Sequence, residues 1–209
     1  MSISINIGNI LNSSTETFHE IIDKLQKKNI ELSKQEVALK NEFDNTLVEA
    51  ILLTIEELKE EEGFMSRLLY SSFGIGKEKN KRREQLIILG SQLKSQLSST
   101  EKSIQKSRHY KENLYSSKKN LTLLHKAFKN KIPFLNSDIL QNRAINYMKE
   151  TNRSIERVTI CEDELEIRIN HLKNTLNQYR KVLRKIPRYY KLKEDTYIQL
   201  IESKGKKEP

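Results

Sequence analysis

The amino-acid sequence predicts an all-α protein, an elongated antiparallel three-helix bundle with coiled-coil (heptad) packing. Three observations lead to this prediction. Helix breakers are scarce, since the 209 residues include only 6 Gly and 3 Pro. Apolar residues make up 36% of the chain, below the roughly 45–50% usual in globular domains, and a thin bundle with a narrow core needs less apolar material. Leucine and isoleucine recur every seven residues over long stretches, which is the spacing of a coiled-coil core.

Breakers and capping residues predict three helices within a single bundle over residues 15–201. The first helix is predicted over about 15–62, because Ser13-Ser14-Thr15 is an N-cap signal and Gly63 marks the end. The polar, Ser/Asn/Ile-rich residues 1–14 before it are predicted to form a flexible leader.

The second helix is predicted over about 78–131. It stops before Pro133, because the residue preceding a proline is pushed out of the helical conformation. The third helix is predicted over about 137–201 and begins at the N-cap pair Ser137-Asp138, and Pro187 inside it predicts a kink. Residues 202–209 are predicted to form a flexible basic tail.

The heptad pattern is most regular in the third predicted helix. A first series of residues seven apart contains Ala144, Thr151, Val158, Leu165, Leu172, Tyr179, Ile186, Lys193 and Leu200. A second series contains Met148, Ile155, Glu162, Ile169, Leu176, Leu183, Tyr190 and Tyr197. In the second helix the main series is Leu86, Leu93, Leu114, Leu121 and Phe128, with Thr100 and Ser107 as interruptions. Such regularity predicts a buried stripe along each helix.

The first predicted helix begins in heptads, at Phe18, Leu25, Leu32 and Leu39, and then drifts to a spacing near four. This drift rotates the apolar stripe around the helix and predicts contact with two neighbours. Polar residues at core positions, such as Glu162, are interpreted as devices that fix the register. One hypothetical pairing sets Lys111 and Lys118 opposite Glu36.

Charge is unevenly distributed along the chain. Residues 1–62 hold 6 basic and 13 acidic residues, residues 63–135 hold 16 and 4, and residues 136–209 hold 16 and 11. The simplest interpretation is that the acidic first helix packs beside the basic second helix. The net charge of +10 favours an acidic partner for the remaining positive charge.

The first connection, residues 63–76, is unusually apolar for the tip of a helical hairpin and is followed by a run of cations. The candidate tip residues are Phe64, Met65, Leu68, Leu69, Phe73, Ile75, Lys77, Lys79, Lys81, Arg82 and Arg83. They are compatible with a cap over the end of the core, with entry into an anionic membrane interface, or with docking of a partner helix.

Residues 179–193 form a second candidate site, in which cations alternate with tyrosines. The candidate basic surface consists of Arg180, Lys181, Arg184, Lys185, Arg188 and Lys191. Because Tyr179, Leu183, Ile186 and Tyr190 belong to the heptad series, the simplest interpretation is a core stripe with a solvated basic face. Contact with nucleic acid, with an anionic membrane or with an acidic protein surface is the alternative.

No catalytic, metal or cofactor site is predicted, and the protein is expected not to be an enzyme. Cys161 is the only cysteine, and the four histidines are far apart in the sequence without ligand spacing. Clustered carboxylates such as those at 60–62 lack the desolvating cleft that acid–base catalysis needs.

The leading functional hypothesis is a helical interaction or scaffold protein that binds a protein partner or self-associates. The alternatives are a peripheral membrane-binding or toxin-like protein that uses the 63–76 tip, and nucleic-acid binding through residues 179–193. In outline, the long-helix plan and basic balance are similar to membrane-bending BAR modules and to soluble forms of α-helical pore formers.

The expected location is the cytoplasm, and no transmembrane segment is predicted because no long apolar run occurs. The leader also resembles the uncleaved export signals of bacterial contact-dependent secretion substrates. This resemblance implies export by a non-Sec route as an alternative.

Overall fold

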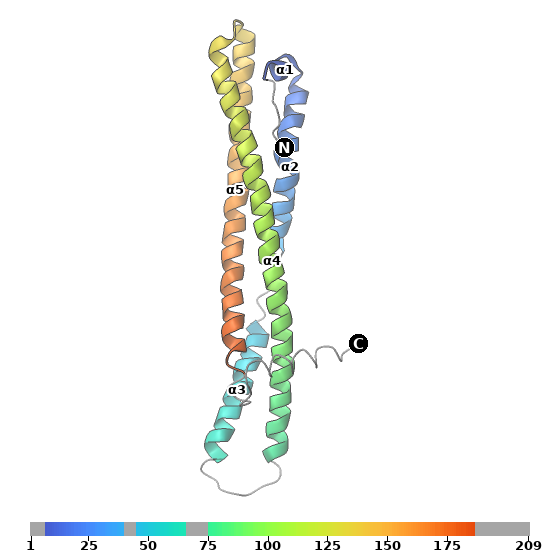
Figure 1. The fold of residues 1–209 in the computed structure, drawn as a ribbon, viewed down its shortest axis with the longest axis vertical. Helices are drawn as coiled ribbons and strands as arrows, with labels where there is room; N and C mark the ends of the chain where they lie inside the picture. Colours follow the sequence, from blue (N-terminus) through green and yellow to red (C-terminus); the bar gives the residue numbers. More distant parts are fainter. Residues whose placement is uncertain (1–6, 40–44, 66–74, 187–209) are drawn as a thin grey trace. The chain divides into compact units, whose positions relative to one another are not determined.

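The fold of the chain comes from a computed structural model that describes residues 7–39, 45–65 and 75–186 (Figure 1). For residues 45, 61–65 and 75–80 it describes the helical backbone but not the side chains. The elements are α1 (Ile7–Asn12), α2 (Thr15–Ala38), α3 (Asn45–Met65), α4 (Ile75–Lys131), the 3-10 turn η1 (Ile132–Phe134) and α5 (Asp138–Leu183). No strand occurs in these ranges, so the predicted all-α class is confirmed.

The chain divides into two compact units, which are described separately. Unit 1 is Met1–Lys40 with Ile104–Asn170, and unit 2 is Asn41–Ser103 with His171–Pro209. Helices α4 and α5 each contribute residues to both units. The prediction of one single bundle over 15–201 therefore remains a prediction.

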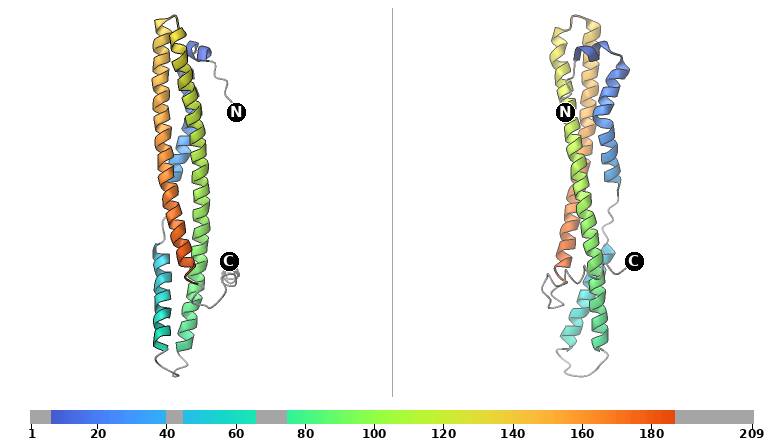
Figure 2. Two further views of the ribbon diagram at one scale, coloured as in Figure 1. Left: turned by 60° about the vertical axis from the view of Figure 1, so that its left-hand side comes forward. Right: turned by 45° about the vertical axis from the view of Figure 1, so that its right-hand side comes forward.

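In unit 1, α2 lies beside α4 and α5, as the views in Figures 1 and 2 agree. Asn29 bonds Ser117 and Glu36 bonds Ser107, so residue numbers fall along α4 as they rise along α2. These two helices are therefore antiparallel. Helices α2 and α5 are parallel, because residue numbers rise along both. Gln26 donates to Ser154, and Arg168 donates to Glu36.

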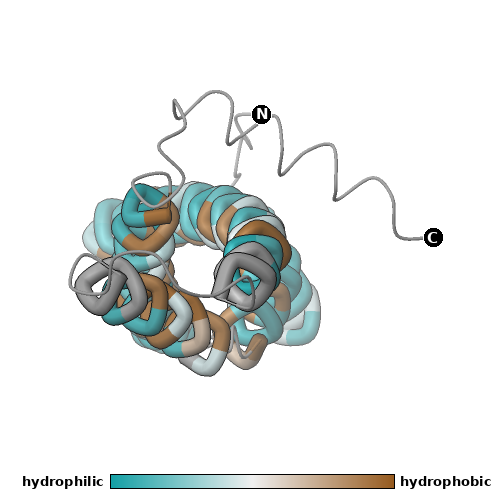
Figure 3. The backbone as a smooth tube through the Cα atoms, turned by 90° about the horizontal axis from the view of Figure 1, so that it is seen from below, coloured by the Kyte–Doolittle hydropathy of each residue, from teal (hydrophilic) through white to brown (hydrophobic). Residues whose placement is uncertain are grey.

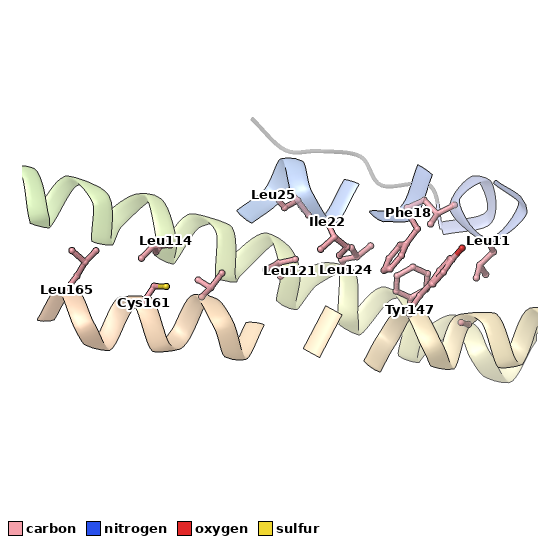
Figure 4. Packing of buried hydrophobic residues seen from close by; sticks show 14 residues of the cluster. Leu11, Phe18, Ile22, Leu25, Leu114, Leu121, Leu124, Tyr147, Cys161 and Leu165 are labelled. Atoms are coloured by element: carbon pink, nitrogen blue, oxygen red, sulfur yellow. The ribbon is translucent and has the colours of Figure 1, made fainter. Parts of the chain in front are cut away.

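The core of unit 1 is built around three aromatic rings from three helices. Phe18 of α2 stacks on Tyr147 of α5, with ring centroids 3.8 Å apart and planes 8° apart. Phe128 of α4 meets both rings edge-on. Figure 4 shows the aliphatic side chains that continue this core along the three helices, among them Ile22, Leu25, Leu114, Leu121 and Leu165.

The core of unit 2 joins α3, the first part of α4 and the last part of α5. Its buried members are Leu47, Ile51, Ile55, Leu58, Leu86, Ile87, Leu93, Tyr179, Val182 and Ile186. Ion pairs lie at its edge: Arg82 to Glu57 at 3.3 Å and Arg180 to Glu101 at 2.8 Å. Both pairs are partly exposed, so each contributes under about 1 kcal/mol.

Burial follows the main heptad series of α4 and α5. In α4 every member from Leu86 to Phe128 is buried, including the interrupting Thr100 and Ser107. In α5 every member from Ala144 to Tyr179 is buried, including Thr151, and so is Ile186 in the turn that follows. The hydroxyls of Thr100 and Thr151 bond carbonyls one turn earlier, which satisfies them without a gap in the stripe. In Figure 3, hydrophobic and hydrophilic residues alternate along the helices, as in amphipathic helices.

The first predicted helix, over 15–62, is two helices in the structure. Ser14 is the N-cap of α2, as the sequence predicts, and its side chain accepts the backbone N–H of Thr17. Helix α2 ends at Ala38, and Leu39 is extended and 55% exposed. Since no glycine or proline lies near Leu39, local sequence gives no reason for this end. A long-range contact does, because Arg168 of α5 donates to the carbonyl oxygen of Leu39 at 2.6 Å.

Residues 7–12, in the segment expected to be a flexible leader, form α1. Ile10 and Leu11 are buried in the unit 1 core. Arg143 of α5 donates to the carbonyl oxygens of Leu11, at 2.8 Å, and Ser13, at 3.4 Å. These carbonyls stand at the end of α1, where no intrahelical donor reaches them. The guanidinium thus attaches α1 to α5.

The third predicted helix, over 137–201, begins as expected and is described as helix to Leu183. A short turn follows, in which Lys185 and Ile186 donate to carbonyls three residues back. Residues 187–209 lie outside the described residues, and so do the predicted kink at Pro187 and the basic tail.

Candidate interaction site

A row of polar side chains runs through the interior of unit 1. Glu36 of α2 is 4% exposed and accepts hydrogen bonds from Ser107 of α4 at 3.2 Å and from Arg168 of α5 at 3.3 Å. Glu36 therefore joins all three helices. Two ion pairs also link α4 to α5. Lys118 pairs with Glu162 at 2.8 Å, and Lys111 pairs with Glu166.

The polar row is suited to fixing the alignment of the three helices. Glu36 and Glu162 are satisfied only when the helices are in this register, because a shift by one turn would leave either buried carboxylate without its cation. Lys111 and Glu166 are partly exposed, so their pair adds little. Glu162 is buried at its predicted core position and pairs with Lys118; its role in fixing the register stays a prediction. The predicted pairing of Glu36 with Lys111 and Lys118 is wrong. Both lysines bind carboxylates of α5, and Glu36 pairs with Arg168.

Helix α5 has an exposed apolar stripe on the side opposite its buried series. Ile160 is 58% exposed and Ile167 is 71% exposed, and the two are seven residues apart. At about 100° per residue, Ile167 lies directly opposite Val158, which is fully buried. The exposed acids Asp163 and Glu164 lie between the isoleucines. We call Ile160, Asp163, Glu164 and Ile167 the α5 outer face.

Helix α4 has an exposed stripe of the opposite charge within unit 1. Tyr115 is 65% exposed and Leu123 is 55% exposed. The exposed cations Arg108, Lys119 and Lys126 lie on the same side. We call these five residues the α4 outer face. The residues chosen for the two outer faces are complementary, since both sets are partly apolar while one carries two acids and the other three cations. Exposed Arg157 lies beside the α5 outer face and exposed Glu112 beside the α4 outer face.

The predicted apolar tip falls largely outside what is described. Residues 66–74 lie outside the described residues. Phe64 and Met65 belong to α3, and Ile75, Lys77 and Lys79 belong to α4, but their side chains are not described. Lys81 is exposed, whereas Arg82 and Arg83 are half-buried, and Arg82 pairs with Glu57. The function assigned to this tip stays a prediction.

The predicted basic surface is described in part. Arg180, Lys181, Arg184 and Lys185 are exposed near the end of α5, while Val182 between them is buried. Arg180 is paired with Glu101, so it is not a free cation. Arg188 and Lys191 lie outside the described residues. The exposure of these four side chains is compatible with the interpretation of this segment as a solvated basic face.

Sequence reasoning missed the two outer faces and the exposed residues Phe134 and Ile139. A signal for the α5 outer face was available, because Ile160 and Ile167 are seven apart but two residues out of phase with the core series. A second apolar series on one helix indicates a second surface to be covered. The exposure of Phe134 and Ile139 depends on the conformation of a turn, which heptad analysis does not reach.

Within the described ranges, no group of three or more His, Cys, Asp or Glu side chains could hold a metal ion. No helix there has an apolar stretch long enough to cross a bilayer. Comparison with protein-family models, with curated proteins and with solved structures finds no match for the chain. Fold and surface together define the class as an all-α protein with exposed, charge-complementary helix faces.

Proposed function

We propose that this protein is a non-enzymatic helical interaction or scaffold protein, which binds a protein partner or self-associates through its long helices. The α5 outer face carries this proposal. Ile160 and Ile167 are mostly exposed although α5 has already buried its heptad series against α2 and α4. Large apolar side chains repeated at helical spacing on an outer face are typical of a helix-in-groove or helix-to-helix contact.

Self-association is favoured by the charges of the two outer faces. The acidic Asp163 and Glu164 of one copy would meet the basic Lys119 and Lys126 of another, with Ile160 and Ile167 against Tyr115 and Leu123. Complementary charges of this kind select the partner and raise the association rate, while the apolar side chains supply the affinity.

The proposal includes a finer fold, an elongated antiparallel three-helix bundle with coiled-coil packing. Support comes from the uninterrupted burial of the α4 and α5 series and from the antiparallel direction of α2 and α4 in unit 1. It also includes a cytoplasmic location, with non-Sec export as the alternative. The single Cys161, buried and unpaired, is compatible with a reducing compartment.

Size-exclusion chromatography with light scattering tests self-association. The wild type should show a mass above the 24.6 kDa of one chain, and Ile160→Lys with Ile167→Lys should return it to one chain. Phe134→Lys with Ile139→Lys is the matched control, because those side chains are at least as exposed but lie outside both faces. The control should keep the higher mass.

A heterologous partner is tested with the same variants. If the wild type is one chain in solution, it is used as bait in its source cells beside the Ile160→Lys, Ile167→Lys variant. A protein captured by the wild type and by the control, and lost with the variant, supports the proposal. A single-chain mass together with identical capture by all three baits would refute it.

A further inference from the structure

The connection between α4 and α5 exposes two large apolar side chains at the end of unit 1. Phe134 is 75% exposed and Ile139 is 73% exposed, the highest values among the large apolar residues that the structure describes. Phe134 ends the turn η1 and Ile139 lies in the first turn of α5. Exposed Pro133 adjoins them. This surface lies apart from both outer faces.

The exposure is a consequence of a well-formed turn. Leu135 donates its backbone N–H to the carbonyl oxygen of Ile132 at 3.2 Å, and Gln141 donates its side-chain N–H to the carbonyl oxygen of Leu135 at 2.7 Å. Ile132, Leu135 and Leu140 pack against the unit 1 core. The turn thus directs three apolar residues inward while Phe134 and Ile139 point to solvent.

Cations surround this apolar end. Lys126, Lys129 and Lys131 are exposed in the last turns of α4. The acid at the turn itself is Asp138, at the N-terminus of α5, where the helix dipole compensates its charge.

We propose that the α4–α5 turn is a membrane-contact surface that recognises anionic phospholipid. Phe134 and Ile139 enter the boundary between headgroups and acyl chains, and Lys126, Lys129 and Lys131 lie against lipid phosphates. Apolar groups at the end of a convex turn with long flexible cations behind them match the layering of a bilayer interface. A protein-binding face would instead offer a groove or a helix flank.

This inference does not depend on the proposed function, because its apolar residues Phe134 and Ile139 and its lysines Lys129 and Lys131 belong to neither outer face. Lys126 is the one residue that the membrane-contact surface shares with the α4 outer face. Two apolar side chains and three lysines give weak, reversible binding rather than permanent anchoring. The turn would then bring the interaction protein to an anionic membrane surface.

Vesicle co-sedimentation of the full chain tests the proposal. The probes are vesicles of phosphatidylcholine alone and of phosphatidylcholine with phosphatidylserine. Wild type should sediment with the anionic vesicles, less as salt is raised, and Phe134→Ser with Ile139→Ser should weaken the partition about tenfold or more. Ile160→Ser with Ile167→Ser, an equally exposed pair, should bind like the wild type.

A fluorescence measurement localises the contact, since the chain contains no tryptophan. Phe134→Trp should shift its emission to the blue when anionic vesicles are added, and Ile160→Trp should not. Lys129→Glu with Lys131→Glu should abolish the Phe134→Trp shift. Circular dichroism identical to the wild type establishes that each variant is folded, as expected for exposed positions.

Several results would overturn the proposal. They are absence of vesicle binding, equal binding to neutral and anionic vesicles, equal losses in the two serine variants, or sedimentation without a Phe134→Trp shift. Binding of an acidic protein at the turn without any vesicle binding would overturn it as well. None of these outcomes affects the light-scattering test of self-association.

Discussion

Arg168→Met should destabilise unit 1 strongly, because Arg168 is the guanidinium that compensates the buried carboxylate of Glu36. The two side chains are 10% and 4% exposed and approach to 3.3 Å. Arg168 also donates to the carbonyl oxygen of Leu39. Methionine keeps most of the aliphatic volume and removes both interactions. Glu36 would then retain the hydroxyl of Ser107 as a donor.

The magnitude follows from the burial of this pair. Removing one partner of a buried ion pair costs about 3–5 kcal/mol, because the other charge stays desolvated without compensation. For a chain of this size about 1 kcal/mol lowers Tm by about 2–4 °C. The expected fall in Tm is therefore about 6–20 °C, followed by far-UV circular dichroism during heating.

The control is the double variant Arg168→Met with Glu36→Leu. It removes both charges, so no unpaired carboxylate is left in the interior and most of the lost stability should return. Ser107 can redirect its hydroxyl to a carbonyl one turn earlier. A single variant that melts within about 2 °C of the wild type would refute the reasoning, as would a double variant less stable than the single.

Substitutions at three further places, Phe18, Ser14 and the Lys118–Glu162 pair, test the packing of unit 1, each by urea unfolding. Phe18→Ala removes a fully buried ring stacked on Tyr147 and should cost about 3–5 kcal/mol; a loss under about 1 kcal/mol would contradict this core. Ser14→Ala removes the N-cap of α2 and should cost about 1 kcal/mol, whereas Ser14→Asp should cost little. Lys118→Glu and Glu162→Lys should each destabilise singly, since each opposes two like charges across α4 and α5. Combined, they should restore most of the stability, and additive losses would show that the register is different.

The sequence was most informative where one helix repeats one pattern. The end of α4 before Pro133 and the cap at Ser14 follow from steric and hydrogen-bonding rules that act within a few residues. The buried series of α4 followed from heptad spacing. Even Thr100 and Ser107, which interrupt it chemically, are buried at their heptad positions.

The failures of sequence reasoning concern contacts between residues far apart in the chain. Nothing local marks Leu39 as the end of α2, because its carbonyl oxygen is satisfied by Arg168 from α5. Likewise α1 is held by Arg143, about 130 residues away. Heptad positions placed Glu162 in the core, where it is buried, but sequence reasoning assigned Glu36 the wrong partner. Several lysines and arginines were equally good candidates until the helices were placed side by side.

By itself, then, the sequence determined that the chain is helical, where α5 begins, and that the main heptad series of α4 and α5 are buried. Periodicity and capping suffice for this, because helix hydrogen bonds and side-chain faces depend on neighbours within a turn or two. Only the tertiary structure decided where α2 stops, which carboxylate meets which cation, and which apolar residues stay in solvent. Those outcomes depend on the relative positions of distant segments. For that reason Ile160 and Ile167, and Phe134 and Ile139, became candidate binding residues only once the helices beside them were in place.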